Sequence, residues 1–138
     1  MPTILLVEDE PDSAELMAHI LEMESFHVVR ARTGDEGLSM AKAEPVDVVL
    51  LDVMLPGVDG FEVCRRLRAD PRTALLPIAF ISAKTRDEDR QAGLQAGADV
   101  YLAKPISRAA LVSATRWLLD GRNTTKPDLT GLPAVDTT

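Results

Sequence analysis

The sequence predicts a doubly wound α/β fold, (βα)5, in which a five-stranded parallel sheet is covered by helices on both faces. Five short apolar runs, rich in Val, Ile and Leu, alternate along the chain with five longer segments of helical spacing. Such alternation is typical of βαβ units and therefore of a parallel sheet. The runs Ile4–Val7 and Val48–Leu51 lack polar residues at alternate positions, which is expected of central strands covered on both sides. Right-handed crossovers then place helices on both faces of the sheet.

The individual elements follow from these two patterns. The apolar runs predict strands at Thr3–Val7, His27–Ala31, Val46–Leu51, Pro77–Ile81 and Asp99–Leu102. The intervening segments place apolar residues at the three- and four-residue spacing of amphipathic helices. They predict helices at Asp12–Glu24, Gly34–Ala43, Gly60–Ala69, Asp87–Ala96 and Ser107–Asp120. In the first of these helices, Leu16, Ile20 and Met23 fall on one face.

Three local signals support the predicted helix ends. Asp59 is followed three residues later by Glu62, a pattern that predicts a capped helix start. Asp70 precedes a proline and is therefore disfavoured in the α region, so the third helix should end there. Gly97 lies just before the fifth strand, where the end of a helix often needs a left-handed residue.

Composition indicates one soluble domain. The 138 residues suit a single domain at 1–120, and the Thr-, Pro- and Gly-rich segment 121–138 is expected to be a flexible tail or linker. With 15 basic and 22 acidic residues the net charge is −7, which argues against direct binding of nucleic acid. Cys64 is the only cysteine, so an internal disulfide and a Cys-rich zinc site are excluded. No signal peptide is visible and no apolar run approaches the ~18 residues of a membrane span. We therefore expect a cytoplasmic protein.

Chemistry-bearing residues follow the predicted strands. In an open parallel sheet, ligands bind beyond the carboxyl ends of the strands. The residues expected there are Glu8, Asp9, Asp52, Ser82 and Lys104. Carboxylates crowded together need a cation, and an all-oxygen donor set favours Mg²⁺. An ionised Asp52 could then attack phosphorus, while Lys104 and the Ser82 hydroxyl engage the oxygens of the phosphoryl group.

Four segments resemble the response-regulator receiver family, in the same order and at similar spacing. They are ILLVEDEPD, VVLLDVMLPGVDGFEVCRRLR, IAFISAK and GADVYLAKP, and the likeness covers roughly residues 3–120. The resemblance implies the strand order 2-1-3-4-5. It also implies that Asp52 accepts a phosphoryl group from the phosphohistidine of a sensor histidine kinase or of a histidine phosphotransfer protein.

The resemblance further implies a role for each matching residue. Glu8 and Asp9 match the acidic pair, with Asp9 as the direct Mg²⁺ ligand, and Met54 matches the position whose backbone carbonyl also binds the metal. Ser82 matches the switch hydroxyl and Lys104 the lysine that contacts the phosphoryl group. The remaining matches are Tyr101, the aromatic switch residue, and Pro105, whose peptide bond with Lys104 is typically cis. Three mild departures are Glu8 where Asp is common, Ser82 where Thr is common, and Ile106 where Phe is frequent.

The function implied is a signalling switch and not a metabolic enzyme. The phosphoryl group on Asp52 would attract Ser82, and Tyr101 would fill the vacated space. The face built from the fourth helix, fifth strand and fifth helix would then favour a downstream effector, a linked output domain or a second copy of the chain. The sequence leaves open whether this is a stand-alone protein or part of a longer one, and it does not identify the kinase or the target.

Three other functions fit the sequence less well. A magnesium-dependent phosphatase that forms an aspartyl phosphate commonly needs an acid two residues after the nucleophile, and Met54 occupies that position. A flavodoxin-like cofactor binder needs a Ser/Thr/Gly-rich loop after the first strand, where this chain has acidic residues at Glu8–Glu10. An interaction module without phosphorylation is disfavoured by the complete set of site residues, but only an assay excludes it.

Overall fold

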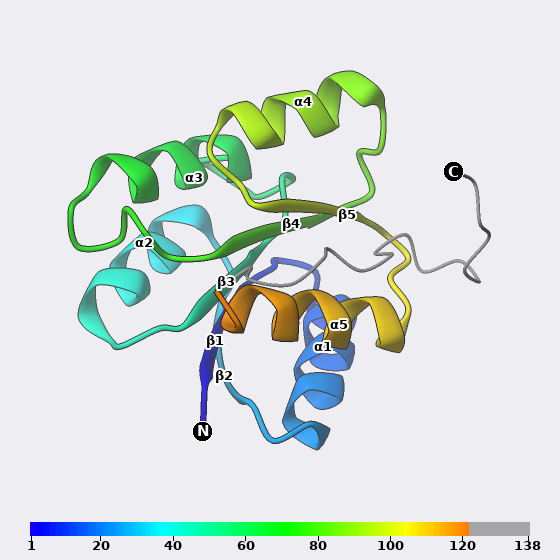
Figure 1. The fold of residues 1–138 in the computed structure, drawn as a ribbon. Coiled ribbons are helices and arrows are strands. Elements are labelled where there is room, and N and C mark those ends of the chain that lie inside the picture. The colour runs from blue at the N-terminus through cyan, green and yellow to red at the C-terminus, as the bar shows by residue number, and fades with distance from the viewer. Residues whose placement is uncertain (122–138) are drawn as a thin grey trace.

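The computed structural model describes residues 1–121, which form one parallel sheet with helices on both faces (Figure 1). The strands of this part of the chain are β1 (Thr3–Val7), β2 (His27–Ala31), β3 (Val48–Leu51), β4 (Ile78–Ser82) and β5 (Val100–Ala103). They are ordered β2-β1-β3-β4-β5, and each neighbouring pair is parallel. The predicted fold class and strand order are therefore confirmed.

The helices divide between the two faces of the sheet. They are α1 (Pro11–Met23), α2 (Gly34–Ala43), α3 (Gly60–Ala69), α4 (Asp87–Gln95) and α5 (Arg108–Leu119). Helices α1 and α5 cover one face, while α2, α3 and α4 lie on the other (Figure 1). No helix among residues 1–121 is long and apolar enough to cross a membrane. The cytoplasmic location stays a prediction.

Two hydrophobic clusters lie on opposite sides of the sheet. Along β1, Ile4 and Leu6 belong to the cluster under α1 and α5, while Leu5 and Val7 belong to the cluster under α2 and α3. This alternation follows from the two-residue period of a strand. These four side chains are at most 1% exposed, which is why the strand carries no polar positions.

The local signals in the sequence mark real helix ends. Asp59 caps α3, because its Oδ1 accepts a hydrogen bond of 2.9 Å from the backbone N–H of Glu62. The backbone turns extended at Asp70, directly after α3. Gly97 has a φ of 112°, a left-handed conformation that side chains other than glycine's rarely adopt.

The apolar face predicted for α1 was wrong in two of its three residues. Leu16 and Met23 are each 59% exposed, and only Ile20 is buried. The buried stripe instead includes Ala14 and Ala18. These small side chains let the helix lie close to the sheet, so the contact with the core does not follow the largest apolar residues.

The prediction of a tail at 121–138 lies, except for Gly121, outside the described residues and stays untested.

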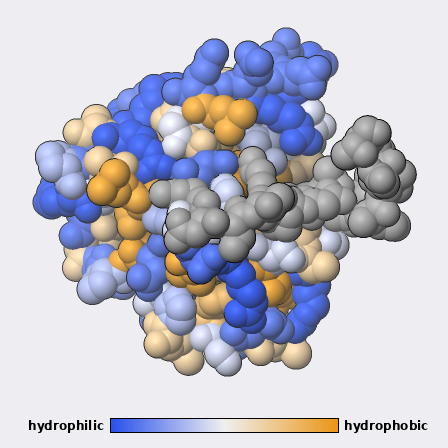
Figure 2. Space-filling view, viewed as in Figure 1, coloured by the Kyte–Doolittle hydropathy of each residue, from blue (hydrophilic) through white to orange (hydrophobic). Residues whose placement is uncertain are grey.

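Within the described part, hydrophilic side chains cover most of the outer surface around α4, at the top of Figure 2.

Candidate functional site

The predicted site residues come from four strand ends at one edge of the sheet. Glu8 follows β1, Asp52 follows β3, Ser82 ends β4 and Lys104 follows β5. The parallel register aligns these ends, because Val7 pairs with Leu51 and Ser82 with Ala103. The sheet topology therefore brings residues nearly 100 positions apart in the sequence into contact, as the Lys104–Glu8 ion pair shows.

Lys104 lies between two buried carboxylates. Its Nζ donates a hydrogen bond of 2.8 Å to Oδ2 of Asp52 and a second one to Oε1 of Glu8. The Glu8 and Asp52 side chains are only 1% and 8% exposed. Burial opposes the charged form of Lys104, but the hydrogen bonds with Asp52 and Glu8 outweigh it and raise the pKa of the ammonium group above its ordinary value.

Glu8 is oriented by the first residues of α1. Its Oε2 accepts a hydrogen bond of 3.1 Å from the backbone N–H of Glu10, and its Oε1 accepts one of 3.3 Å from the Ser13 hydroxyl. Glu10 in turn caps α1 by accepting from the N–H groups of Asp12 and Ser13. The start of the helix thus fixes one carboxylate of the site.

The position of Asp52 depends on a glycine. Its Oδ1 accepts a hydrogen bond of 3.2 Å from the backbone N–H of Met54. A Cβ atom on Gly60 would lie 2.1 Å from the Asp52 backbone oxygen, so only glycine allows α3 to begin this close to the end of β3. Sequence reasoning identified Gly60 only as part of a helix start. Its contact with Asp52 depends on the path of the loop between β3 and α3, which no local pattern reveals.

Ser82 and Tyr101 both contact the loop between β4 and α4. Ser82 is fully buried, and its Oγ accepts a hydrogen bond of 3.2 Å from the N–H of Lys84. The hydroxyl of Tyr101 donates to the carbonyl oxygen of the same residue, Lys84. Burial of the ring raises the pKa of Tyr101 above its ordinary value. The ring is 8% exposed in this structure, in which Asp52 pairs with Lys104, so it already occupies a buried position.

The peptide bond between Lys104 and Pro105 is cis, the geometry that the resemblance implies. It joins the end of β5 to the segment before α5.

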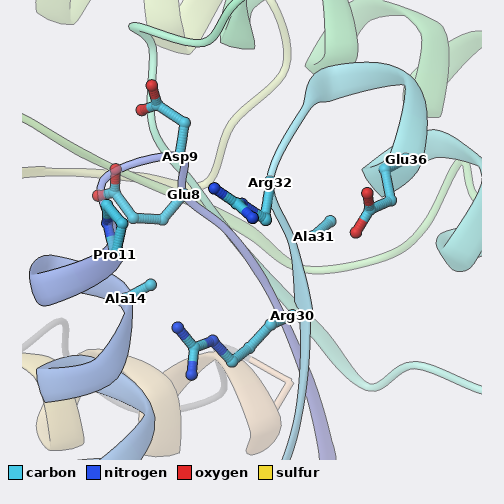
Figure 3. A pocket seen from close by; sticks show the side chains of 8 residues that line it. All are labelled: Glu8, Asp9, Pro11, Ala14, Arg30, Ala31, Arg32 and Glu36. Atoms are coloured by element: carbon cyan, nitrogen blue, oxygen red, sulfur yellow. The ribbon is translucent and has the colours of Figure 1, made fainter.

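Asp9 stands apart from the other two carboxylates. It lines a pocket of about 280 Å³ together with Glu8, Arg30 and Arg32 (Figure 3). Within residues 1–121, no group of three or more His, Cys, Asp or Glu side chains is placed to hold a metal ion. Lys104 draws Glu8 and Asp52 together, whereas Asp9 is exposed. The three predicted carboxylates are therefore not gathered around one point.

The donor chemistry nevertheless fits Mg²⁺. The three carboxylates of Glu8, Asp9 and Asp52 and the one ammonium of Lys104 leave a net charge of −2 among the four groups. Mg²⁺ is held by one or two carboxylates and keeps several waters, so it needs no cluster of three acidic side chains. Asp9, Asp52 and the backbone carbonyl of Met54 are oxygen donors of the kind it prefers.

Comparisons with known proteins point to one family. The profile described as response regulator receiver domain matches residues 4–116. The DNA-binding dual master transcriptional regulator RpaA of Synechocystis sp. is 40% identical over 119 residues, which are 86% of this chain and 49% of that protein. The chain thus spans about half the length of this relative and of two other transcriptional regulators that it matches at 40% identity.

Two solved receiver domains have the same fold. The signal receiver domain of a histidine kinase from Syntrophus aciditrophicus has a TM-score of 0.82 at 31% identity, covering 91% of this chain and 95% of that one. The receiver domain of the sensor histidine kinase PA1611 from Pseudomonas aeruginosa PAO1 has a TM-score of 0.79 at 34% identity, covering 85% and 97%. That structure is described with a magnesium ion coordinated in the active site cleft.

Proposed function

The chain belongs to the response regulator receiver domain family, and from this premise we propose that it is a phosphorylation-dependent switch with Asp52 as its phosphoacceptor. Receiver domains are signalling domains of two-component systems and not metabolic enzymes. The observation that carries the proposal is the contact of 2.8 Å between Lys104 and a buried Asp52 carboxylate at the end of a central strand. This pairing supports a chemical role for Asp52, because a simple turn residue would not need a half-buried lysine beside it.

The donor in this proposal is the phosphohistidine of a sensor histidine kinase or of a histidine phosphotransfer protein. A carboxylate oxygen of Asp52 attacks phosphorus, so that a P–O bond forms and the P–N bond breaks. The electron pair of the broken bond stays on the imidazole, which takes up a proton. Lys104, already bonded to Asp52, and the Ser82 hydroxyl donate hydrogen bonds to the phosphoryl oxygens as charge develops there.

Mg²⁺ is the proposed cofactor, held by Asp9, Asp52 and the backbone carbonyl of Met54, with Glu8 beside it. When bound, it supplies positive charge that offsets the repulsion between the carboxylates and the incoming phosphoryl group. The net charge of −2 among the four site groups supports this proposal, as does the magnesium ion described in the PA1611 receiver domain.

The output in this proposal is a change in the face formed by α4, β5 and α5. Ser82 and Tyr101 both contact Lys84, so a phosphoryl group that attracts the Ser82 hydroxyl also acts on the loop to which Tyr101 is bonded. The partner is a downstream effector, a linked output domain or a second copy of the chain. Direct binding of nucleic acid by this domain is not expected, because the net charge of the chain is −7.

The test is phosphorylation with a small-molecule donor. The protein, Asp52→Asn and the control Asp35→Asn, which changes an exposed carboxylate on α2, are incubated with phosphoramidate with and without Mg²⁺. We expect the intact mass of the wild type and of Asp35→Asn to rise by one phosphoryl group only when Mg²⁺ is present, and that of Asp52→Asn to stay unchanged. Equal labelling of Asp52→Asn would refute the assignment of Asp52. An unmodified wild type would instead favour the interaction module.

A further inference from the structure

Helix α4 approaches β5 through a glycine. A Cβ atom on Gly93 would lie 2.7 Å from Cδ2 and 3.0 Å from Cε2 of Tyr101, and 3.1 Å from Cδ2 of Phe80. The 2.7 Å contact is shorter than real Cβ contacts and the other two are tight, so a residue larger than glycine at position 93 requires the Tyr101 ring or α4 to shift. Glycine in a helix interior weakens the helix, so this close packing has a cost for α4.

Gly93 is also the only residue of α4 that is buried. The outer surface of the helix is largely hydrophilic (Figure 2). The packing of α4 on the sheet therefore depends strongly on the contact between Gly93 and the Tyr101 ring.

Arg90 holds the same ring from one helical turn earlier. Its guanidinium carbon lies 5.6 Å from the centroid of the Tyr101 ring, within the range of a cation–π interaction. Its Nη1 donates to the Tyr101 carbonyl oxygen at 3.5 Å and its Nε to the Thr85 carbonyl oxygen at 3.4 Å. Arg90 thereby joins α4, β5 and the loop between β4 and α4.

We propose that Gly93 and Arg90 are positioning residues that keep the Tyr101 ring buried while Asp52 is unphosphorylated. The contacts that hold the ring come from α4, from Phe80 on β4 and from the carbonyl of Lys84. The face of α4, β5 and α5 is consequently formed before phosphorylation, and a phosphoryl group reinforces a ring position that is already populated. The inference rests on the proposed function for one point, that Tyr101 is a switch residue.

The experiment reads the ring directly, because Tyr101 is the only tyrosine in the chain. Uniform incorporation of 3-fluorotyrosine gives a 19F spectrum from a single site. We expect the unphosphorylated wild type to show one resonance that is protected from a soluble paramagnetic reagent. In Gly93→Ala the resonance should move to the position of a solvent-exposed ring and lose that protection. In Arg90→Ala we expect partial exposure, which Arg90→Lys reverses in part by restoring the charge.

The matched control is Gln91→Ala, an exposed substitution in the same helix, which should leave the resonance unchanged. A Tyr101 resonance as protected in Gly93→Ala as in the wild type would overturn the proposal.

A thermal melt keeps the proposal falsifiable if Gly93→Ala unfolds. In a Tyr101→Ala background the ring is absent, so adding Gly93→Ala should leave Tm equal or higher, because alanine favours the helix. The same substitution should lower Tm when Tyr101 is present. An equal drop in both backgrounds would place the clash elsewhere and refute the proposal.

The two proposals fail separately. Phosphorylation of Asp52 is followed by intact mass on the same samples, whereas the ring position is read before any donor is added. A wild type that stays unphosphorylated contradicts the proposed function, and the ring measurement still decides the role of Gly93 and Arg90.

Discussion

Lys104 neutralises one of two buried negative charges, and this shapes the energetics of the site. Glu8 and Asp52 are both almost fully buried, and each hydrogen-bonds to the same ammonium group. A buried carboxylate is tolerated only when it is paired or hydrogen-bonded. The two carboxylates therefore share one cation. A bound divalent ion would neutralise the negative charge that remains.

Removing the ammonium group should destabilise the protein and make it dependent on Mg²⁺. We expect Lys104→Ala to lower the free energy of unfolding by about 2 kcal/mol in EDTA, because the partners are left as uncompensated buried charges. Mg²⁺ should recover much of this loss in Lys104→Ala and have a smaller effect on the wild type. Urea denaturation with and without Mg²⁺ measures both effects.

The pH range of this effect follows from the pKa of Lys104, which is raised above 10.5. A raised pKa gives stabilisation that is complete below the pKa of the unfolded chain and is lost only as pH rises through the folded value. The loss in Lys104→Ala should therefore be the same at pH 7 and pH 9. Lys42→Ala, whose ammonium lies 3.7 Å from Asp70 near the surface, is the control and should cost less than about 0.5 kcal/mol. A loss as large in Lys42→Ala would contradict the argument.

At this scale the sequence predicts where the site residues come from but not how each side chain points. Asp52 and Lys104 follow unbroken apolar strands, so the shared edge of a parallel sheet is enough to bring them together. The exposure of Asp9 depends on a side-chain conformation at the surface. The buried position of Tyr101 depends on the close approach of α4 at Gly93. No periodic pattern in the sequence predicts either of these two side-chain positions.

At the scale of the elements, the alternation of apolar and helical patterns predicts the type and order of the strands and helices. It predicts their first and last residues less well. The strands Thr3–Val7 and His27–Ala31 and the helices Gly34–Ala43 and Gly60–Ala69 have the predicted bounds. The fourth strand extends to Ser82 instead of ending at Ile81, because backbone pairing with Ala103 continues past the apolar run. Hydrogen-bond pairing between strands sets such ends, and a single strand's composition does not show it.

Glu24 fastens the end of α1 to α5 through two arginines. Its two carboxylate oxygens accept hydrogen bonds of 2.7 Å from Arg108 and 2.8 Å from Arg116. The hydrogen bonds from Arg116 and Arg108 lower the pKa of Glu24 below its ordinary value of 4.5. These two helices cover the same face of the sheet. The two ion pairs therefore join the end of α1 to α5 within that layer.

The ion pairs of Glu24 with Arg108 and Arg116 predict an acid-sensitive contribution to stability. A lowered carboxyl pKa gives stabilisation that is present above the unfolded value of 4.5 and is lost as pH falls through the folded value. We expect Glu24→Gln to melt roughly 1–4 °C below the wild type at pH 7, as for other solvent-screened ion pairs. That difference should shrink as pH falls below 4.5 and through the lowered folded value, in thermal melts followed by circular dichroism. Glu22→Gln, an exposed neighbour, should melt like the wild type throughout. A difference that does not shrink as the solution is acidified would mean that packing, and not charge, is lost.

At the scale of the whole molecule, the described residues 1–121 hold two hydrophobic clusters and a capped last helix. Both described hydrophobic clusters draw their buried members from Ile4 to Leu118. The end of α5 is closed within the same segment, because the N–H of Asp120 bonds to the carbonyl of Arg116 and that of Gly121 to the carbonyl of Leu118. Gly121 has a φ of 72°, the left-handed conformation common just after a helix.

A chain that ends at Gly121 should therefore fold as the full chain does. We expect its Tm to differ by less than about 2 °C, and its urea m-value to be unchanged, because m scales with the surface that folding buries. A chain that ends at Ala110 is the matched control. It lacks the buried side chains of Leu111, Ala114 and Leu118 on α5 and should lose the cooperative transition. A clearly lower m-value for the chain ending at Gly121 would show that residues beyond it bury surface in the folded state, and the domain would then extend past the predicted boundary.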